Sequence, residues 1–260
     1  MHFILQIVTG LIKDPLVLER ATSTLESSSS YQRGNYKAGI LFPDSPLLSD
    51  TDQKTLKDLH SALRRLCSLA KAGSVRIDLD AEQTVFQPAI DHYYRVLSTE
   101  FNKLEKSGLN APIIYNTFQC YLKSTPERIK KSLAEAKANN LSFGAKLVRG
   151  AYVDWERAEA KSKSREDPIW STKPETDACF DSCAHLMTEE IAEDVKKNGD
   201  NPQVGVMYAS HNISSIRRVL EEMRRRKLVW NDQAQGKLVI EDKMRTRVVF
   251  GQLLGWFPCK

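Results

Sequence analysis

Residues 146–161 read KLVRGAYVDWERAEAK and join a short apolar run to a longer charged segment. Leu147 and Val148, between the cations Lys146 and Arg149, are typical of a short buried strand. A Gly-Ala-Tyr corner ends this run, and the Glu, Arg, Ala and Lys residues that follow favour a helix. A strand that leads into a helix is one βα unit, so the fold depends on whether such units repeat along the chain.

Similar apolar runs recur along the chain and alternate with longer segments of helical period. The clearest of these segments places Leu56, Leu59 and Leu63 at intervals of three and four residues and ends at Gly73. This alternation predicts helices that connect the strands of a parallel sheet. The six expected strands are residues 3–9, 75–80, 113–119, 145–149, 204–210 and 248–253.

Alternating βα units form either an open doubly wound sheet or a closed (β/α)8 barrel. An open sheet with a dinucleotide site would show Gly-x-Gly-x-x-Gly directly after a strand, and the sequence contains no such run. We therefore predict an α/β fold of the TIM-barrel type in one domain, residues 1–260, with long surface loops at about 27–49 and 162–176. Because only six of the eight strands of a barrel are visible, we expect the barrel to be incomplete.

Composition limits the classes of partner. The 260 residues carry 38 basic and 33 acidic side chains, interspersed along the chain, for a formal net charge of +5. This balance is too mild to predict a nucleic-acid partner. The five cysteines are scattered and lie mostly in apolar patterns, which indicates reduced core residues. Cys179 and Cys183 share a helix face, but His185 is rotated away from them, so we predict no metal site.

The apolar start of the sequence, MHFILQIVTGLI, is too short to span a membrane. It also lacks the basic, serine-rich composition of an organelle transit peptide, so no targeting peptide is visible in this chain. No later segment approaches the length of a membrane span.

Polar residues at the carboxyl ends of the expected strands are the candidates for function, because a βα barrel has its active site there. They are Asp78, Asp80, Glu82, Gln83, Gln119, Lys146, Arg149, Ser210, His211, Asn212 and Gln252. Each has an ordinary alternative: Asp80 or Asn212 could cap a helix, and His211 could be a satisfied loop residue. Together they offer no activated Ser or Cys and no three-ligand metal set, which argues against hydrolysis. A bound organic cofactor or a Schiff-base lysine remains.

The sequence resembles proline dehydrogenases in five segments that follow the family's order: DAEQTVFQPAI, YNTFQCYLK, GAKLVRGAYVDWERA, YASHN and VVFGQLLG. The resemblance extends over residues 75–255 and is closest to eukaryotic members of the mitochondrial, fungal type. It implies a distorted (β/α)8 barrel with FAD bound noncovalently at its mouth. It also implies that L-proline is oxidised to 1-pyrroline-5-carboxylate, that ubiquinone accepts the electrons, and that the protein is mitochondrial and associates peripherally with the mitochondrial inner membrane.

The same resemblance implies roles for individual residues. Lys146 is expected near the reactive part of the flavin, and Asp80 takes the position of the active-site carboxylate. Fixed cations near the ring would stabilise its electron-rich reduced form. Tyr152 is a further candidate. The residues expected to contact the cofactor are Leu79, Gln119, Arg149, Gly150, Ala151, Ser210, His211 and Gln252.

Two departures from the family pattern accompany the resemblance. The family's first strand ends with a lysine, where this sequence has Ile7 and Val8. The paired arginines that hold the proline carboxylate, and the tyrosine before them, would fall beyond Lys260, so we expect a chain truncated at its C-terminus and impaired in activity. Two alternatives stay open: a noncatalytic fragment that associates with the full-length enzyme, and a barrel lyase that uses Lys146 as a Schiff base.

Overall fold

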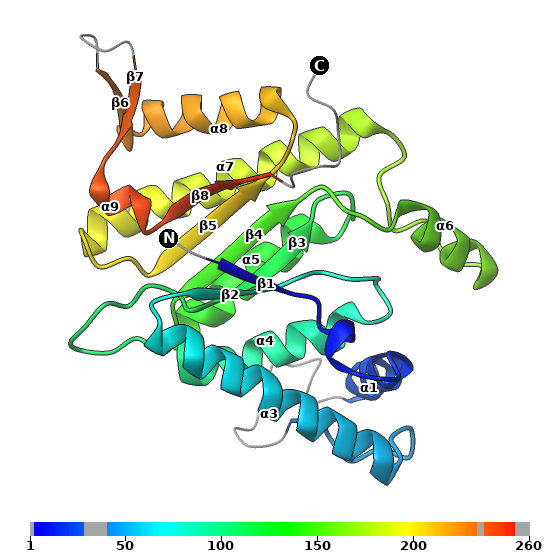
Figure 1. Ribbon diagram of the computed structural model, residues 1–260. Helices are drawn as coiled ribbons and strands as arrows, with labels where there is room; N and C mark the ends of the chain where they lie inside the picture. The colour runs from blue at the N-terminus through cyan, green and yellow to red at the C-terminus, as the bar shows by residue number, and fades with distance from the viewer. Residues whose placement is uncertain (1–2, 29–40, 233–236, 253–260) are drawn as a thin grey trace.

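Six parallel strands form the centre of the computed structural model, which describes residues 3–28, 41–232 and 237–252. The strands follow the order β1-β2-β3-β4-β5-β8 across a curled sheet (Figure 1). They are β1 (Phe3–Gln6), β2 (Arg76–Leu79), β3 (Ile114–Gln119), β4 (Phe143–Val148), β5 (Val204–Ala209) and β8 (Val248–Gly251). Each overlaps one predicted strand, which confirms the α/β class and the parallel sheet. Leu253, at the end of the last predicted strand, lies outside the described residues.

Helices connect the strands and cover the outer side of the curved sheet, with α7 against both β4 and β5 (Figure 1). The helical segments are η1 (Thr9–Leu11), α1 (Leu16–Ser27), α3 (Asp50–Ala72), α4 (Gln87–Phe101), α5 (Thr125–Ala138), α6 (Val153–Ser162), α7 (Lys173–Asn198), α8 (Ile213–Arg225) and α9 (Asp242–Arg245). Ser49 and Thr172 form capping boxes at the starts of α3 and α7. Asn212 Oδ1 accepts hydrogen bonds from the first amides of α8. Such caps stabilise a helix by about 1 kcal/mol each.

Successive residues of each strand point to opposite sides of the sheet. On β4, Phe143, Ala145 and Leu147 are buried in a hydrophobic core with residues of α5 and α7. The alternate residues Gly144 and Lys146 therefore face the inner side of the curve. Because all six strands are parallel, the inner side chains at their carboxyl ends gather at one end of the sheet.

The sequence pattern does not predict the antiparallel hairpin between α8 and β8. β6 (Val229–Asp232) pairs with β7 (Lys237–Ile240), and Val229 lies opposite Ile240. Val229 is buried in the same core as β4 and β5. The apolar runs here, residues 228–230 and 238–240, have only three residues each and are followed by polar ones, so periodicity does not distinguish them from a loop.

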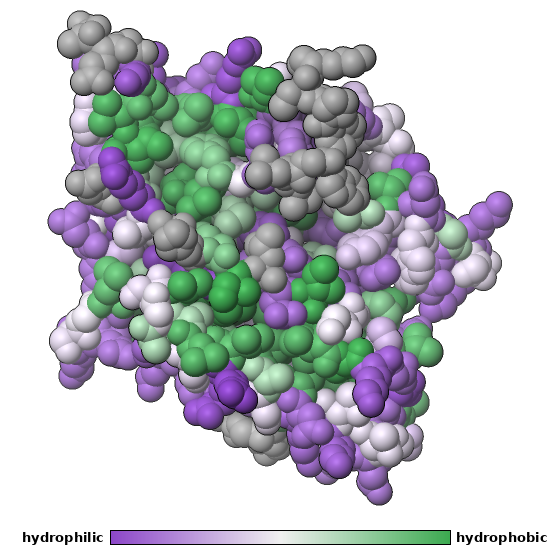
Figure 2. Space-filling view, viewed as in Figure 1, coloured by the Kyte–Doolittle hydropathy of each residue, from purple (hydrophilic) through white to green (hydrophobic). Residues whose placement is uncertain are grey.

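Within the described residues, β1 and β8 each pair with one neighbour, so the sheet is a curled half-barrel. Figure 2 shows apolar side chains over β1 and over the region of β8 and the hairpin. Large apolar residues that stay exposed on these elements include Ile4 of β1, Trp230 of β6 and Phe250 of β8. This arrangement agrees with the predicted incomplete barrel.

The predicted surface loops lie partly outside the described residues. α1 ends at Ser27, and residues 41–49 contain no helix or strand. Between α6 and α7 the chain makes one isolated bridge, from Leu122 to Ile169. The division into a single domain stays a prediction. None of the helices that the structure describes is long and apolar enough to cross a membrane.

Candidate functional site

The ammonium group of Lys146 joins three strands on the inner side of the sheet. Its Nζ donates to Asp78 Oδ2 at 2.8 Å and to Asp80 Oδ1 at 2.5 Å. β3 contributes Thr117, whose hydroxyl donates to Asp78 Oδ1 at 3.0 Å. Asp78 is fully buried, whereas the Asp80 side chain is 22% exposed. The cluster therefore contains one cation and two carboxylates, and solvent reaches one of those carboxylates.

Burial and charge act in opposite directions on the pKa values of this cluster. Burial raises the pKa of Asp78 to about 6 and nearby Asp80 adds to the rise, although the Lys146 ammonium opposes it. Burial alone would lower the pKa of Lys146, but the two carboxylates outweigh it and raise that pKa above its usual value. Lys146 is thus held in its charged form.

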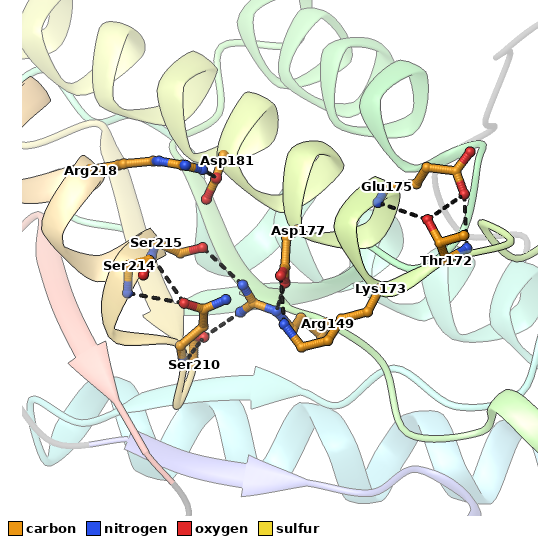
Figure 3. Close-up of polar contacts among 11 residues, drawn as sticks. Arg149, Thr172, Lys173, Glu175, Asp177, Asp181, Ser210, Ser214, Ser215 and Arg218 are labelled. Atoms are coloured by element: carbon orange, nitrogen blue, oxygen red, sulfur yellow. Dashed lines mark hydrogen bonds and ion pairs between the residues drawn. The ribbon is translucent and has the colours of Figure 1, made fainter.

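Arg149 lies one residue past β4 and points toward the first turns of α7 and α8 (Figure 3). Its Nε donates to Asp177 Oδ1 at 2.8 Å and its Nη2 to Ser215 Oγ at 2.8 Å. Its Nη1 donates to Ser210 Oγ, and the guanidinium carbon lies 4.5 Å from the centre of the Phe180 ring. These contacts, including a cation–π contact, fix the positive charge at the end of the sheet.

The turn after Arg149 is shaped by close packing. Gly150 has φ +139°, and a Cβ there would lie 2.1 Å from the Tyr121 ring, so the position requires glycine. The Ala151 amide donates to Gln119 Oε1 at 3.2 Å, and Gln119 Nε2 donates to the Glu82 carbonyl at 2.9 Å. Through these two hydrogen bonds the buried Gln119 side chain connects the loop after β2 to the loop after β4.

The other predicted site residues occupy different environments. The Leu79 side chain is buried in the core behind the sheet, so only its backbone can face the mouth. Ser210 is buried, and its carbonyl accepts a 3.4 Å hydrogen bond from the exposed Gln252. His211 is exposed at the corner before α8. Tyr152 is half-buried, and burial raises its pKa. The roles of all these residues stay predictions.

Sequence reasoning misses several residues that hold the site together. Thr117 could have been found, because it precedes Gln119 by two residues and therefore shares its side of β3. Asp78 is among the predicted strand-end candidates and bears the same relation to Asp80, but the family resemblance assigns it no role. Asp177 follows Arg149 by 28 residues, and no local pattern connects the two.

The charged and polar groups at the strand ends, beside small residues, are compatible with a flat organic cofactor. Lys146 and Arg149 supply fixed positive charge, and the Gln119 amide and the turn supply polar backbone and side-chain groups. Beside them, Ala209 of β5 is paired with Gly251 of β8, so these strand ends present little side-chain bulk. Small residues allow a ring to approach the sheet closely.

A metal centre finds no support in the part of the chain that the structure describes. No group of three or more His, Cys, Asp and Glu side chains there is arranged to hold a metal ion. Cys67, Cys120, Cys179 and Cys183 are buried free thiols, as predicted, and Cys259 lies outside the described residues.

The fold defines a protein of the βα-barrel class, with charged side chains gathered at the carboxyl ends of its strands. A sequence model of the family described as proline dehydrogenase matches residues 13–255. The chain belongs to the proline dehydrogenase family.

Named relatives agree with this assignment. The chain is 35% identical over 216 residues to proline dehydrogenase 1, mitochondrial, of Drosophila melanogaster. The matched segment covers 80% of this chain and 28% of that protein. The chain is 37% identical over 213 residues to the Homo sapiens protein of the same name, covering 81% and 31%. A Bos taurus hydroxyproline dehydrogenase is 36% identical over 176 residues, covering 68% and 36%. The chain therefore spans about a third of the length of these relatives.

Solved structures share the fold. Proline utilization A from Bdellovibrio bacteriovorus superposes with a TM-score of 0.59 at 24% identity, covering 79% of this chain and 18% of that one. The Corynebacterium freiburgense protein of the same name gives a TM-score of 0.59 at 20% identity, covering 98% and 20%. At these identities the likeness supports the fold alone.

Proposed function

We propose that this chain provides the cofactor-binding part of a proline dehydrogenase barrel. In this proposal it binds FAD noncovalently and takes part in the oxidation of L-proline to 1-pyrroline-5-carboxylate, with ubiquinone as the electron acceptor. The observation that carries the proposal is the end of β4, where a carboxylate-paired Lys146 and a helix-anchored Arg149 lie three residues apart. The names of the relatives favour a mitochondrial location, and peripheral association with the inner membrane belongs to the same proposal.

The residues at the mouth have distinct tasks in this proposal. FAD, when bound, supplies the acceptor for the two electrons that leave the substrate. Lys146 and Arg149 are cationic groups at this end of the sheet; a cationic group beside the ring favours its electron-rich reduced form, although carboxylates compensate both charges here. Asp80, as the partly exposed carboxylate, can accept a hydrogen bond from the secondary ammonium group of proline and orient it. Gln119 holds the two mouth loops in register for both ligands.

The Schiff-base alternative is disfavoured by the environment of Lys146. A lysine that attacks a carbonyl must be neutral, and enzymes achieve this by lowering its pKa. Here Asp78 and Asp80 raise the pKa of Lys146 and keep it charged. Borohydride trapping of a carbonyl substrate on Lys146 would instead support the Schiff-base lyase alternative.

The test is a flavin titration followed by reduction. The 260-residue chain is mixed with FAD, and the dissociation constant is measured by quenching of flavin fluorescence. L-Proline or 4-hydroxyproline is then added without oxygen, and bleaching of the flavin absorbance reports reduction. Asp80→Ala should weaken proline-dependent bleaching strongly. Lys123→Met is the matched control, because Lys123 forms a surface ion pair with Glu166 at 2.8 Å.

The outcomes distinguish the proposed function from the remaining alternatives. Bleaching by proline supports the proposal, and bleaching by hydroxyproline alone would change the substrate but keep the cofactor. FAD binding without bleaching by either amino acid would favour the noncatalytic alternative. Absence of FAD binding would overturn the proposed function of this chain.

A further inference from the structure

The two carboxylates on Lys146 are unequal in their surroundings. Both oxygens of Asp78 are engaged, one by Lys146 and one by Thr117, and the residue is fully buried. In the described part of the chain, the Asp80 side chain has Lys146 as its one hydrogen-bond or ion-pair partner. A ligand from solvent can reach Asp80 and cannot reach Asp78.

We propose that Asp78 is a positioning residue: it is the permanent counter-ion that holds the Lys146 ammonium in place and so allows Asp80 to exchange Lys146 for a cationic ligand. The part of this inference that names the ligand, a secondary ammonium group, rests on the proposed function. The part that concerns Lys146 does not.

The charge balance explains why two carboxylates are needed. Asp78 and Lys146 form a neutral buried pair, so the remaining negative charge of the cluster resides on Asp80. If Asp80 turned toward a ligand in the absence of Asp78, the buried ammonium would lose its last counter-ion. Leaving a buried charge without a partner is strongly unfavourable, so Asp80 would stay on Lys146.

Thr117 completes the arrangement. Its hydroxyl donates to the Asp78 oxygen that Lys146 does not use, and it comes from the neighbouring strand β3. This hydrogen bond fixes the rotation of the Asp78 carboxylate, so that its second oxygen stays directed at Lys146. Three parallel strands thus hold one ammonium group in place before any ligand arrives.

The test compares the reactivity of Lys146 in Asp78→Asn and Asp80→Asn versions of the whole 260-residue chain. Acetylation of Lys146 is followed by mass spectrometry over a range of alkaline pH, without cofactor or substrate. In Asp78→Asn the labelling rate should rise by about tenfold, because Lys146 loses its fixed counter-ion and more of it is neutral. In Asp80→Asn the rate should change by no more than about threefold, because Asp78 stays in place.

Controls separate this result from a general loss of structure. Asp91→Asn removes a half-buried carboxylate outside the mouth, which pairs at 2.6 Å with Arg128 of α5, and should leave Lys146 labelling unchanged. Thr117→Val should also raise the labelling rate, but by less than Asp78→Asn does. It replaces Asp78→Asn in the comparison if that variant does not fold. Equal or greater labelling in Asp80→Asn than in Asp78→Asn or Thr117→Val would overturn the proposal.

The ligand part has its own measurement. In the FAD-loaded chain, Asp78→Asn should raise the proline concentration for half-maximal flavin reduction by about tenfold, since Asp80 stays on Lys146 and the substrate cation loses its partner. An unchanged half-maximal concentration would overturn this part. If the unsubstituted chain shows no proline-dependent reduction, the proposed function fails, while the labelling comparison still decides the role of Asp78.

Discussion

Two buried cations, Arg247 and Lys146, lie at opposite ends of the same sheet and are used differently. Arg247, just before β8, is fully buried, and its Nε donates to Asp194 Oδ2 at 2.7 Å. Its other two nitrogens donate to the carbonyls of Lys243 and Gly199, each at 2.7 Å. Lys146, at the carboxyl end, instead shares one ammonium between two carboxylates.

The difference lies in charge balance and access. One carboxylate neutralises Arg247, and its other partners are backbone carbonyls that no ligand can displace. At Lys146 the carboxylates exceed the cation by one, and solvent reaches Asp80. A balanced, closed ion pair stabilises the fold, whereas an unbalanced, partly open one retains an interaction that a ligand can replace. The closed pair lies at one end of the sheet, and the open cluster lies at the end where the functional site is predicted.

Breaking the closed pair should have the largest effect. Asp194→Asn leaves the Arg247 charge buried without a counter-ion, which typically costs about 3–5 kcal/mol in the free energy of unfolding. Urea denaturation of the variant and the parent chain measures this loss. A loss below about 1 kcal/mol would show that Arg247 finds water or another partner, and the contrast with Lys146 would disappear.

The second largest effect is expected in the pH dependence of stability, which tests the buried carboxylate of the open cluster formed by Lys146, Asp78 and Asp80. The pKa of Asp78 is raised to about 6, above its ordinary value of 3.8, so the folded state binds this proton more tightly than the unfolded state. Stability from this group is therefore present below pH 3.8 and is lost as pH rises through about 6.

Asp78→Asn removes this titration and provides the comparison. Over that pH window the parent chain should lose about 2–3 kcal/mol of unfolding free energy relative to Asp78→Asn. Urea midpoints at a series of pH values give the two curves. Parallel curves would mean that burial does not raise the pKa of Asp78 in the folded chain. Its ion pair with Lys146 would then resemble the balanced pair of Arg247.

Sequence alone predicts the six parallel strands and the polar residues at their ends, but not the β6–β7 hairpin and not which side chains bind one another. The order of apolar runs predicts β4 and its neighbours, because alternation of buried residues is a local property. The position of Lys146 and Asp80 at strand ends follows from the same pattern. Their ion pair depends on strand register, and Asp177 reaches Arg149 only through the packing of α7 against β4 and β5.

The turn that follows Arg149 offers a smaller test. Gly150→Ala should cost about 1–3 kcal/mol of stability and weaken FAD binding, because the new methyl group meets the Tyr121 ring at 2.1 Å. Gly108→Ala is the matched control: Gly108 has φ +111°, but a Cβ there would meet nothing within 4 Å. If both variants lose the same stability by urea denaturation, backbone strain and not the packing on Tyr121 decides the effect.

The smallest expected effect concerns Arg149, whose charge is already compensated by Asp177. Arg149→Met should make bound FAD harder to reduce, by about 1 kcal/mol or less, since a neighbouring carboxylate screens the guanidinium. Asp177→Asn should act in the opposite direction, because it leaves Arg149 as an uncompensated cation near the ring. The flavin midpoint potential of each variant, with Lys123→Met as control, gives the sign. Shifts of the same sign would show that both substitutions disturb the packing of α7 on the sheet, and that the Arg149 charge does not act on the cofactor. Opposite signs would show that the Arg149 charge acts on the cofactor even though Asp177 pairs with it.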